Sequence, residues 1–120
     1  MPSTMPARDV IRILEARVIL EQHNLELSIG SVYCSDLMSD ILSYSKDDSL
    51  LITGLINPQI VRTAEMVEIA LICFVHHKLP QEETLELARE NRIPLVSTRF
   101  SMYEACGRLY AAGLGRENGG

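Results

Sequence analysis

The chain has 120 residues, of which 47% are hydrophobic and only 5% aromatic, and its formal net charge is −5. This length fits one domain with an aliphatic core. The acidic balance argues against a nucleic-acid-binding protein, which needs clustered Lys and Arg. The longest strictly apolar run, Ile69 to Val75, is far too short to cross a membrane. We therefore expect a globular protein with no nucleic-acid or membrane partner.

The cysteines Cys34, Cys73 and Cys106 are far apart and form no CxxC pair, so neither a zinc ribbon nor a redox dithiol is indicated. We expect all three to be buried free thiols in a reducing compartment. No signal peptide is visible, because Arg8 and Asp9 precede any apolar stretch. These features predict a cytoplasmic protein.

For the first half of the chain, the sequence predicts a flexible start at residues 1–5, followed by short helices and strands. The stretch 22–30 has alternating apolar residues and is equally consistent with a loop or an edge strand. The other predicted elements are a helix over 6–16, strands over 17–21 and 32–34, a helix over 36–45 begun by Ser35 and Asp36, and a turn at 46–48.

The second half alternates regularly between strands and helices. Strands are predicted over 49–53, 69–75 and 94–97, and helices over 57–66, 80–91 and 101–112. Asn57 and Ser101 are the predicted N-caps of the first and last of these helices, and Gly113 is predicted to end the last one. This order predicts an α/β fold in three layers, α/β/α, with a mostly parallel sheet. We expect a single domain over 6–113 and a flexible tail over 114–120.

Ligands of parallel α/β proteins bind outside the carboxyl ends of the strands. Each short segment there precedes a helix whose free N–H groups can hold an anion. The candidate ligand-binding residues selected by this rule are Ser35, Asp36, Thr53, Gly54, Asn57, His76, His77, Ser97, Thr98 and Ser101.

Gly54 lies at a strand-to-helix turn, and two explanations compete for it. Its backbone can approach a phosphate or carboxylate closely, or the turn can simply require a positive φ, which we favour. Neither GxGxxG nor GxxxxGK[ST] occurs in the sequence, so dinucleotide and P-loop binding lack their usual support.

His76 and His77 suggest a metal ligand or a general base. Adjacent histidines at a strand end point to opposite sides, and no further ligand cluster accompanies them. We favour a polar loop, and we expect no metal, cofactor or catalytic residue. Asp36 and Asp40 form a carboxylate pair one turn apart, but a helix start at Asp36 and a solvated Asp40 are the simpler explanation. For Arg99, likewise, a solvated side chain is favoured over an anion partner.

The segment 49–112 resembles a DRTGG domain in its order of strands, turns and helices. VYCSDLMSDIL, at 32–42, is similar to the V-x-x-SDLLSDVM segment of that family. Leu79-Pro80 and the strand from Pro94 to Ser97 are retained. The two signature elements are largely replaced. The "GDR" position reads Gly54-Leu55-Ile56, and the "TGG" position reads Val75-His76-His77.

The resemblance implies a fold like the N-terminal domain of HPr kinase/phosphorylase. It also implies a non-catalytic, regulatory role in a prokaryotic protein, often at an oligomer interface. Our leading hypothesis is a regulatory or protein-interaction module, not an enzyme, that forms a homodimer and binds an unidentified ligand or protein partner. The alternatives are a nucleotide- or small-anion-binding sensor and, less favoured, a metal-dependent enzyme that uses His76 and His77.

Overall fold

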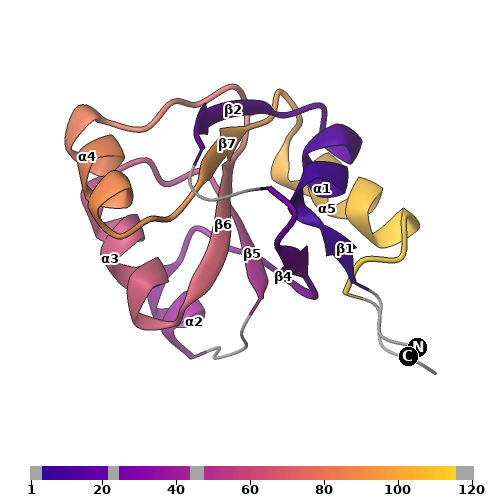
Figure 1. Ribbon diagram of the computed structural model, residues 1–120, viewed down its shortest axis with the longest axis horizontal. Coiled ribbons are helices and arrows are strands. Elements are labelled where there is room, and N and C mark those ends of the chain that lie inside the picture. The colour runs from indigo at the N-terminus through magenta and orange to yellow at the C-terminus, as the bar shows by residue number, and fades with distance from the viewer. Residues whose placement is uncertain (1–3, 22–24, 44–47, 116–120) are drawn as a thin grey trace.

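The computed structural model describes residues 4–21, 25–43 and 48–115. Within these residues, seven strands form two sheets (Figure 1). The strands are β1 (Met5–Pro6), β2 (Arg17–Leu20), β3 (Ser28–Ile29), β4 (Ser31–Cys34), β5 (Ser49–Thr53), β6 (Ile69–Phe74) and β7 (Leu95–Ser97). The helices are α1 (Ala7–Ile13), α2 (Met38–Leu42), α3 (Pro58–Met66), α4 (Glu82–Glu90) and α5 (Met102–Ala111).

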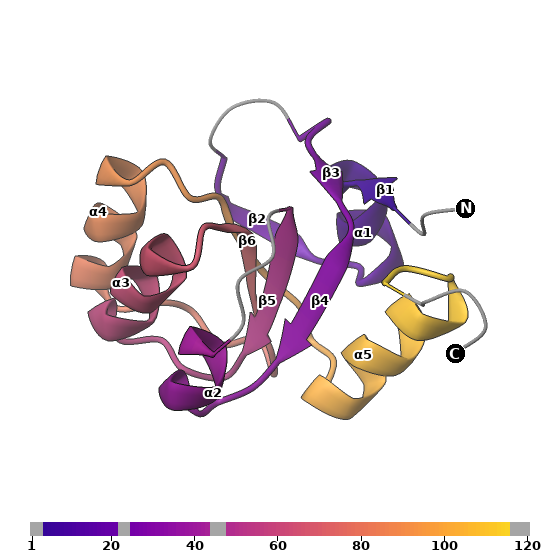
Figure 2. The ribbon, with the colours of Figure 1, turned by 90° about the horizontal axis from the view of Figure 1, so that it is seen from below.

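The main sheet has five strands in the order β2-β7-β6-β5-β4. The pairs β4–β5, β5–β6 and β6–β7 are parallel, whereas β2 pairs with β7 in the antiparallel direction. Helices α2, α3 and α4 cover one face of this sheet, and α1 and α5 cover the other (Figures 1 and 2). The predicted α/β/α layers and mostly parallel sheet are confirmed.

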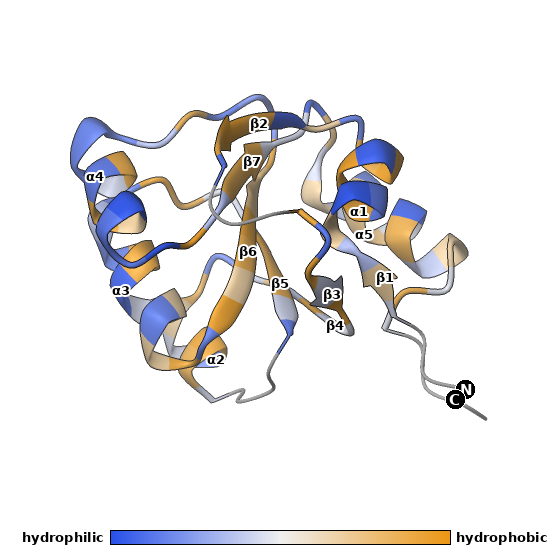
Figure 3. Ribbon diagram, viewed as in Figure 1, coloured by the Kyte–Doolittle hydropathy of each residue, from blue (hydrophilic) through white to orange (hydrophobic). Residues whose placement is uncertain are grey.

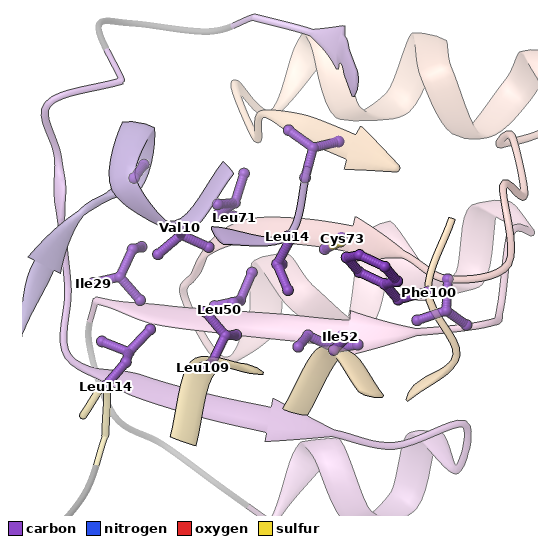
Figure 4. Close-up of a cluster of buried hydrophobic side chains, with 14 residues drawn as sticks. Val10, Leu14, Ile29, Leu50, Ile52, Leu71, Cys73, Phe100, Leu109 and Leu114 are labelled. Carbon is purple, nitrogen blue, oxygen red and sulfur yellow. The ribbon is translucent and has the colours of Figure 1, made fainter. Parts of the chain in front are cut away.

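Successive side chains of the central strands supply the two halves of the core. Leu50 and Leu71 point toward α1 and α5, where they pack with Val10 and Leu109 (Figure 4). Leu51 belongs to the other cluster, beneath α3 and α4. Since both faces are covered, all of β5 is buried. The hydropathy colouring agrees, because the strands are mainly apolar and the helices show polar residues (Figure 3).

The packed region extends past the expected 6–113 boundary at both ends. Met5 pairs with Ile29 in the small β1–β3 sheet, so that Ser28 and Ile29 form a short strand, whereas the other described residues of 22–30 do not. Leu114 is only 3% exposed, because Gly113 turns the chain at φ +94° and Leu114 N–H donates to the Leu109 carbonyl. Residues 1–3, 22–24, 116–120 and the expected turn at 46–47 lie outside the described residues.

The expectation of three buried free thiols is wrong for two of them. Cys34 and Cys106 form a disulfide across 72 residues of sequence, joining the end of β4 to α5. Only Cys73 matches the expectation: it is buried, and burial raises the pKa of its thiol to about 12. The fold brings the other two together by placing α5 beside the edge strand, which the sequence spacing did not indicate.

No helix within the described ranges is both long and apolar enough to cross a lipid bilayer.

The loop after β6 has a strained backbone. His76 and His77 both adopt left-handed conformations, with φ values of +57° and +59°. Their N–H groups donate to the carbonyls of Phe100 and Thr98, at 2.9 and 2.8 Å, which holds the loop in this shape. Left-handed backbone costs a non-glycine residue roughly 1–2 kcal/mol.

We predict that His76→Gly and His77→Gly each raise the free energy of unfolding by about 0.5–1 kcal/mol, because glycine adopts this backbone without steric cost. Urea unfolding followed by circular dichroism measures the change. His76→Ala keeps the Cβ and should gain nothing. Gln81→Gly is the matched control in the same loop region, since Gln81 is exposed and has φ −64°. If both histidine variants lose as much stability as Gln81→Gly, the strain is absent.

Candidate functional site

The carboxyl ends of β4, β5, β6 and β7 lie side by side at one edge of the sheet, because these neighbouring strands are parallel. The last residues of these strands and the loops that follow them carry all ten candidate residues predicted from the sequence. Direct hydrogen bonds join these loops to one another, so the edge is built as a connected surface.

Asp36 joins the β4 loop to the β5 loop. Its Oδ1 accepts hydrogen bonds from the Gly54 N–H at 2.6 Å and from the Thr53 hydroxyl at 3.0 Å. Asp36 does not cap the following helix, which begins later than expected and has Leu37 at its N-cap position without a side-chain bond. The prediction that Asp36 serves the helix start was therefore wrong. Ser35 instead accepts the Leu37 N–H in a local turn.

Gly54 does not have the positive φ that we favoured from the sequence. A Cβ at this position would lie 3.2 Å from Lys78 Nζ and 3.3 Å from Asp36 Oδ2. A side chain at position 54 would therefore crowd two charged groups of the protein itself. From the sequence, a close approach to Gly54 was considered only for a bound anion, as the less favoured explanation.

Lys78 also lies at this edge, although it was not among the candidates selected from the sequence. Its ammonium group donates to the Gly54 carbonyl at 3.1 Å, and the residue is exposed. It brings a positive charge to the same glycine that Asp36 holds through the amide. The only signal in the sequence was its position after His77, in a loop that follows a buried strand.

The loop after Thr53 is also held from the side of α4. The Ile56 carbonyl accepts the Thr84 hydroxyl at 2.6 Å and the Gln81 N–H at 3.1 Å. Asn57 caps α3 as predicted, since its side-chain oxygen accepts the Ile60 N–H. This loop therefore has a defined conformation against both helices.

The hydroxyl groups after β7 are engaged within the protein. Ser97 donates to the Lys78 carbonyl at 2.8 Å, and Thr98, which is fully buried, donates to the Leu14 carbonyl at 2.6 Å. Ser101 accepts the Glu104 N–H and so caps α5, as predicted. These three side chains fix the β7 loop against β6, α1 and α5.

Both histidines after β6 are exposed, as the polar-loop interpretation predicts. Across the described parts of the chain, no three His, Cys, Asp or Glu side chains are grouped so that they could hold a metal ion.

Arg99 is exposed, with 54% of its side chain accessible to solvent, and it also pairs with groups of the protein. Its guanidinium donates to Glu15 at 2.9 Å, and it lies over the ring of Phe100. Arg108 stacks on the same ring and also reaches Glu15. The hydrogen bond from Arg99 is the main cause that lowers the pKa of Glu15. This cluster secures the β7 loop from the α1 side.

The carboxyl edge presents the exposed ammonium group of Lys78, which has further donor capacity, and the carboxylate of Asp36. Both groups lie beside Gly54, close to the position that a Cβ would occupy. A cavity of about 340 Å³ lies at the opposite end of the sheet, lined among others by Glu68, Arg92 and Pro94. The cavity therefore does not coincide with the residues that the strand-end rule selects.

Comparisons with known proteins agree with this architecture. The model of the DRTGG domain family matches residues 9–112. Among solved structures, the chain is similar to the CBS and DRTGG domains of the regulatory region of Clostridium perfringens pyrophosphatase, a structure complexed with the activator diadenosine tetraphosphate. The TM-score is 0.73 at 14% sequence identity, over 92% of this chain and 48% of that one.

This chain therefore spans about half the length of the pyrophosphatase regulatory region. No curated protein matches it. At this level of identity the structural likeness establishes the fold, and the family match covers most of the chain. The chain belongs to the DRTGG domain family.

Proposed function

We propose that this protein is a non-catalytic regulatory module that acts in the cytoplasm. The observation that carries the proposal is the use of the polar side chains at the carboxyl edge. Asp36, Ser97 and Thr98 each bond to backbone groups of a neighbouring segment. Side chains used in this way give loops a fixed shape, which a binding surface needs. The regulatory region of the similar pyrophosphatase supports the same role.

We predict that Asp36→Ala lowers the free energy of unfolding by about 1–3 kcal/mol, because it leaves the buried Gly54 N–H without an acceptor. Asp36→Asn keeps an acceptor oxygen and should lose less. Asp40→Ala is the matched control, since Asp40 is exposed on α2. Urea unfolding compares the three variants. Equal losses for Asp36→Ala and Asp40→Ala would show that Asp36 does not hold the edge together.

A second candidate function is nucleotide binding at this edge, with Lys78 as the group that contacts phosphate. Lys78 is exposed and is positioned by its bond to Gly54. The nucleotide activator bound to the pyrophosphatase regulatory region also favours this ligand class.

We expect one of AMP, ADP, ATP, GTP or diadenosine tetraphosphate to stabilise the protein, by about 2.7 kcal/mol at 100 times its dissociation constant. Thermal denaturation screens the panel, and calorimetry measures affinity. Lys78→Gln should weaken binding roughly 10- to 100-fold, as expected for a charged hydrogen bond. Arg62→Gln is the control, because it removes an exposed positive charge on α3. The absence of a shift with every nucleotide would reject this ligand class.

We also propose that the protein forms a homodimer through apolar side chains on α2 and the end of α3. Leu37, Leu42 and Met66 are 57%, 45% and 67% exposed, which is unusual for side chains of this size. Among the methionines of the helices, Met66 is exposed, whereas Met38 and Met102 are half-buried.

Sedimentation equilibrium at micromolar concentration should return the mass of a dimer. The double variant Leu37→Glu/Leu42→Glu should return a monomer, because charges in an apolar contact are desolvated without partners. Tyr103→Glu is the control on α5, since Tyr103 is 90% exposed. A monomer mass for the unmodified protein would exclude the dimer.

A further inference from the structure

We propose that the Cys34–Cys106 disulfide is a reversible thiol–disulfide switch, and that its opening loosens helix α5 and the adjoining carboxyl edge of the sheet. This proposal is independent of the nature of the ligand. It starts from the one covalent link in the described residues between elements that are distant in sequence.

The disulfide lies at one edge of the main sheet, where a strand has a partner on one side only. Cys34 is the last residue of β4, which is an edge strand and pairs only with β5. Cys106 is in the middle of α5, the helix beside β4 in Figure 2. The helix is otherwise held to the sheet by buried residues such as Ala105 and Leu109. Opening the disulfide therefore removes the covalent bond between α5 and the edge strand β4.

The sulfur atoms are accessible to a reagent. Cys34 is exposed, and a cavity of about 190 Å³ is lined by both cysteines together with Val32, Leu109 and Tyr110. Cys73 is different, because it is fully buried and burial raises the pKa of its thiol to about 12. Since the thiolate is the reactive form, thiol exchange is confined to the Cys34–Cys106 pair.

The co-reactant is a low-molecular-weight thiol and its disulfide, of which glutathione is the probe used below. A glutathione thiolate attacks Cys34 Sγ, the Cys34–Cys106 bond breaks, and Cys106 leaves as a thiolate that takes a proton. A second glutathione thiolate attacks the mixed disulfide and releases Cys34 and oxidised glutathione. The protein gains two electrons and two protons, and two glutathione molecules are oxidised. Oxidised glutathione reverses both steps.

The position of Cys34 connects this bond to the candidate site. The next residue, Ser35, donates its N–H to Ile52, and Asp36 then holds Gly54 and Thr53. At the other end, α5 begins directly after the loop whose Phe100 carbonyl accepts the His76 N–H. Both cysteines thus belong to elements that border the carboxyl edge. Opening the disulfide can therefore alter the edge through the loop after β4 and through the loop before α5.

The test is a redox titration of the full chain in a series of glutathione buffers, from fully oxidised to fully reduced. Acid quenching and maleimide labelling, followed by peptide mass spectrometry, report each cysteine. We expect Cys34 and Cys106 to become labelled together within the series and to re-form the disulfide when the buffer is reversed. Cys73 should stay unlabelled until the protein is unfolded.

Two results would overturn the switch. The disulfide can persist in the most reducing glutathione buffer, which makes it a purely structural bond. The cysteines can remain thiols or single mixed disulfides in the most oxidising buffer.

Hydrogen exchange tests the coupling. On reduction, amides of α5 and of residues 35–37 and 53–55 should exchange at least ~10-fold faster, because the loss of a cross-link lowers local stability. Amides of α4, on the opposite face, are the internal control and should not change. Cys106→Ser should reproduce the reduced pattern in oxidising buffer. Identical exchange in oxidised and reduced protein would show that the bond does not act on the edge.

Discussion

The carboxyl edge of the sheet depends on one carboxylate. Asp36 binds the amide and hydroxyl of the β5 loop, and Lys78 reaches the carbonyl of the same glycine from the β6 loop. A Cβ on residue 54 would lie within 3.2 to 3.4 Å of both charged groups and would crowd them. The loops that follow β4, β5 and β6 are therefore joined by hydrogen bonds at Gly54. These bonds fix the positions of the loops after β5 and β6. This constraint explains how a short chain keeps four loops in a defined arrangement.

The elements that were predictable are those specified by local chemistry. Asn57 and Pro58 begin α3, Ser101 begins α5, and Gly113 ends the last helix, all within a few residues. The features that were missed join distant positions. The partner of Asp36 is 18 residues away, and the two bonded cysteines are 72 residues apart. Spacing along the sequence contains little information about such contacts, because they form only when the sheet order is known.

Membership of the DRTGG family is visible in the backbone where the signature residues are replaced. His76 and His77 occupy the position at which the resemblance expects two glycines, and both have the positive φ that glycine favours. Gly54, kept from the other signature, has no positive φ and instead lies close to the charged groups of Asp36 and Lys78. The backbone conformation limits the choice of residue at positions 76 and 77, whereas neighbouring side chains limit it at position 54. Substitution of the first pair costs strain, whereas a side chain at the second would displace Asp36 or Lys78.

The antiparallel pairing of β2 with β7 has a consequence for how the chain folds. The units from β5 to β7 consist of strands and helices close in sequence, so their contacts can form early at a small cost in loop entropy. Strand β2 pairs with residues that lie 75 to 80 positions further along the chain, as Leu20 opposite Leu95 and Arg17 opposite Ser97 show. During synthesis the ribosome delivers β2 long before its partner exists. Strand β2 is therefore the first strand of the main sheet to leave the ribosome, and it stays unpaired longer than any other strand of that sheet.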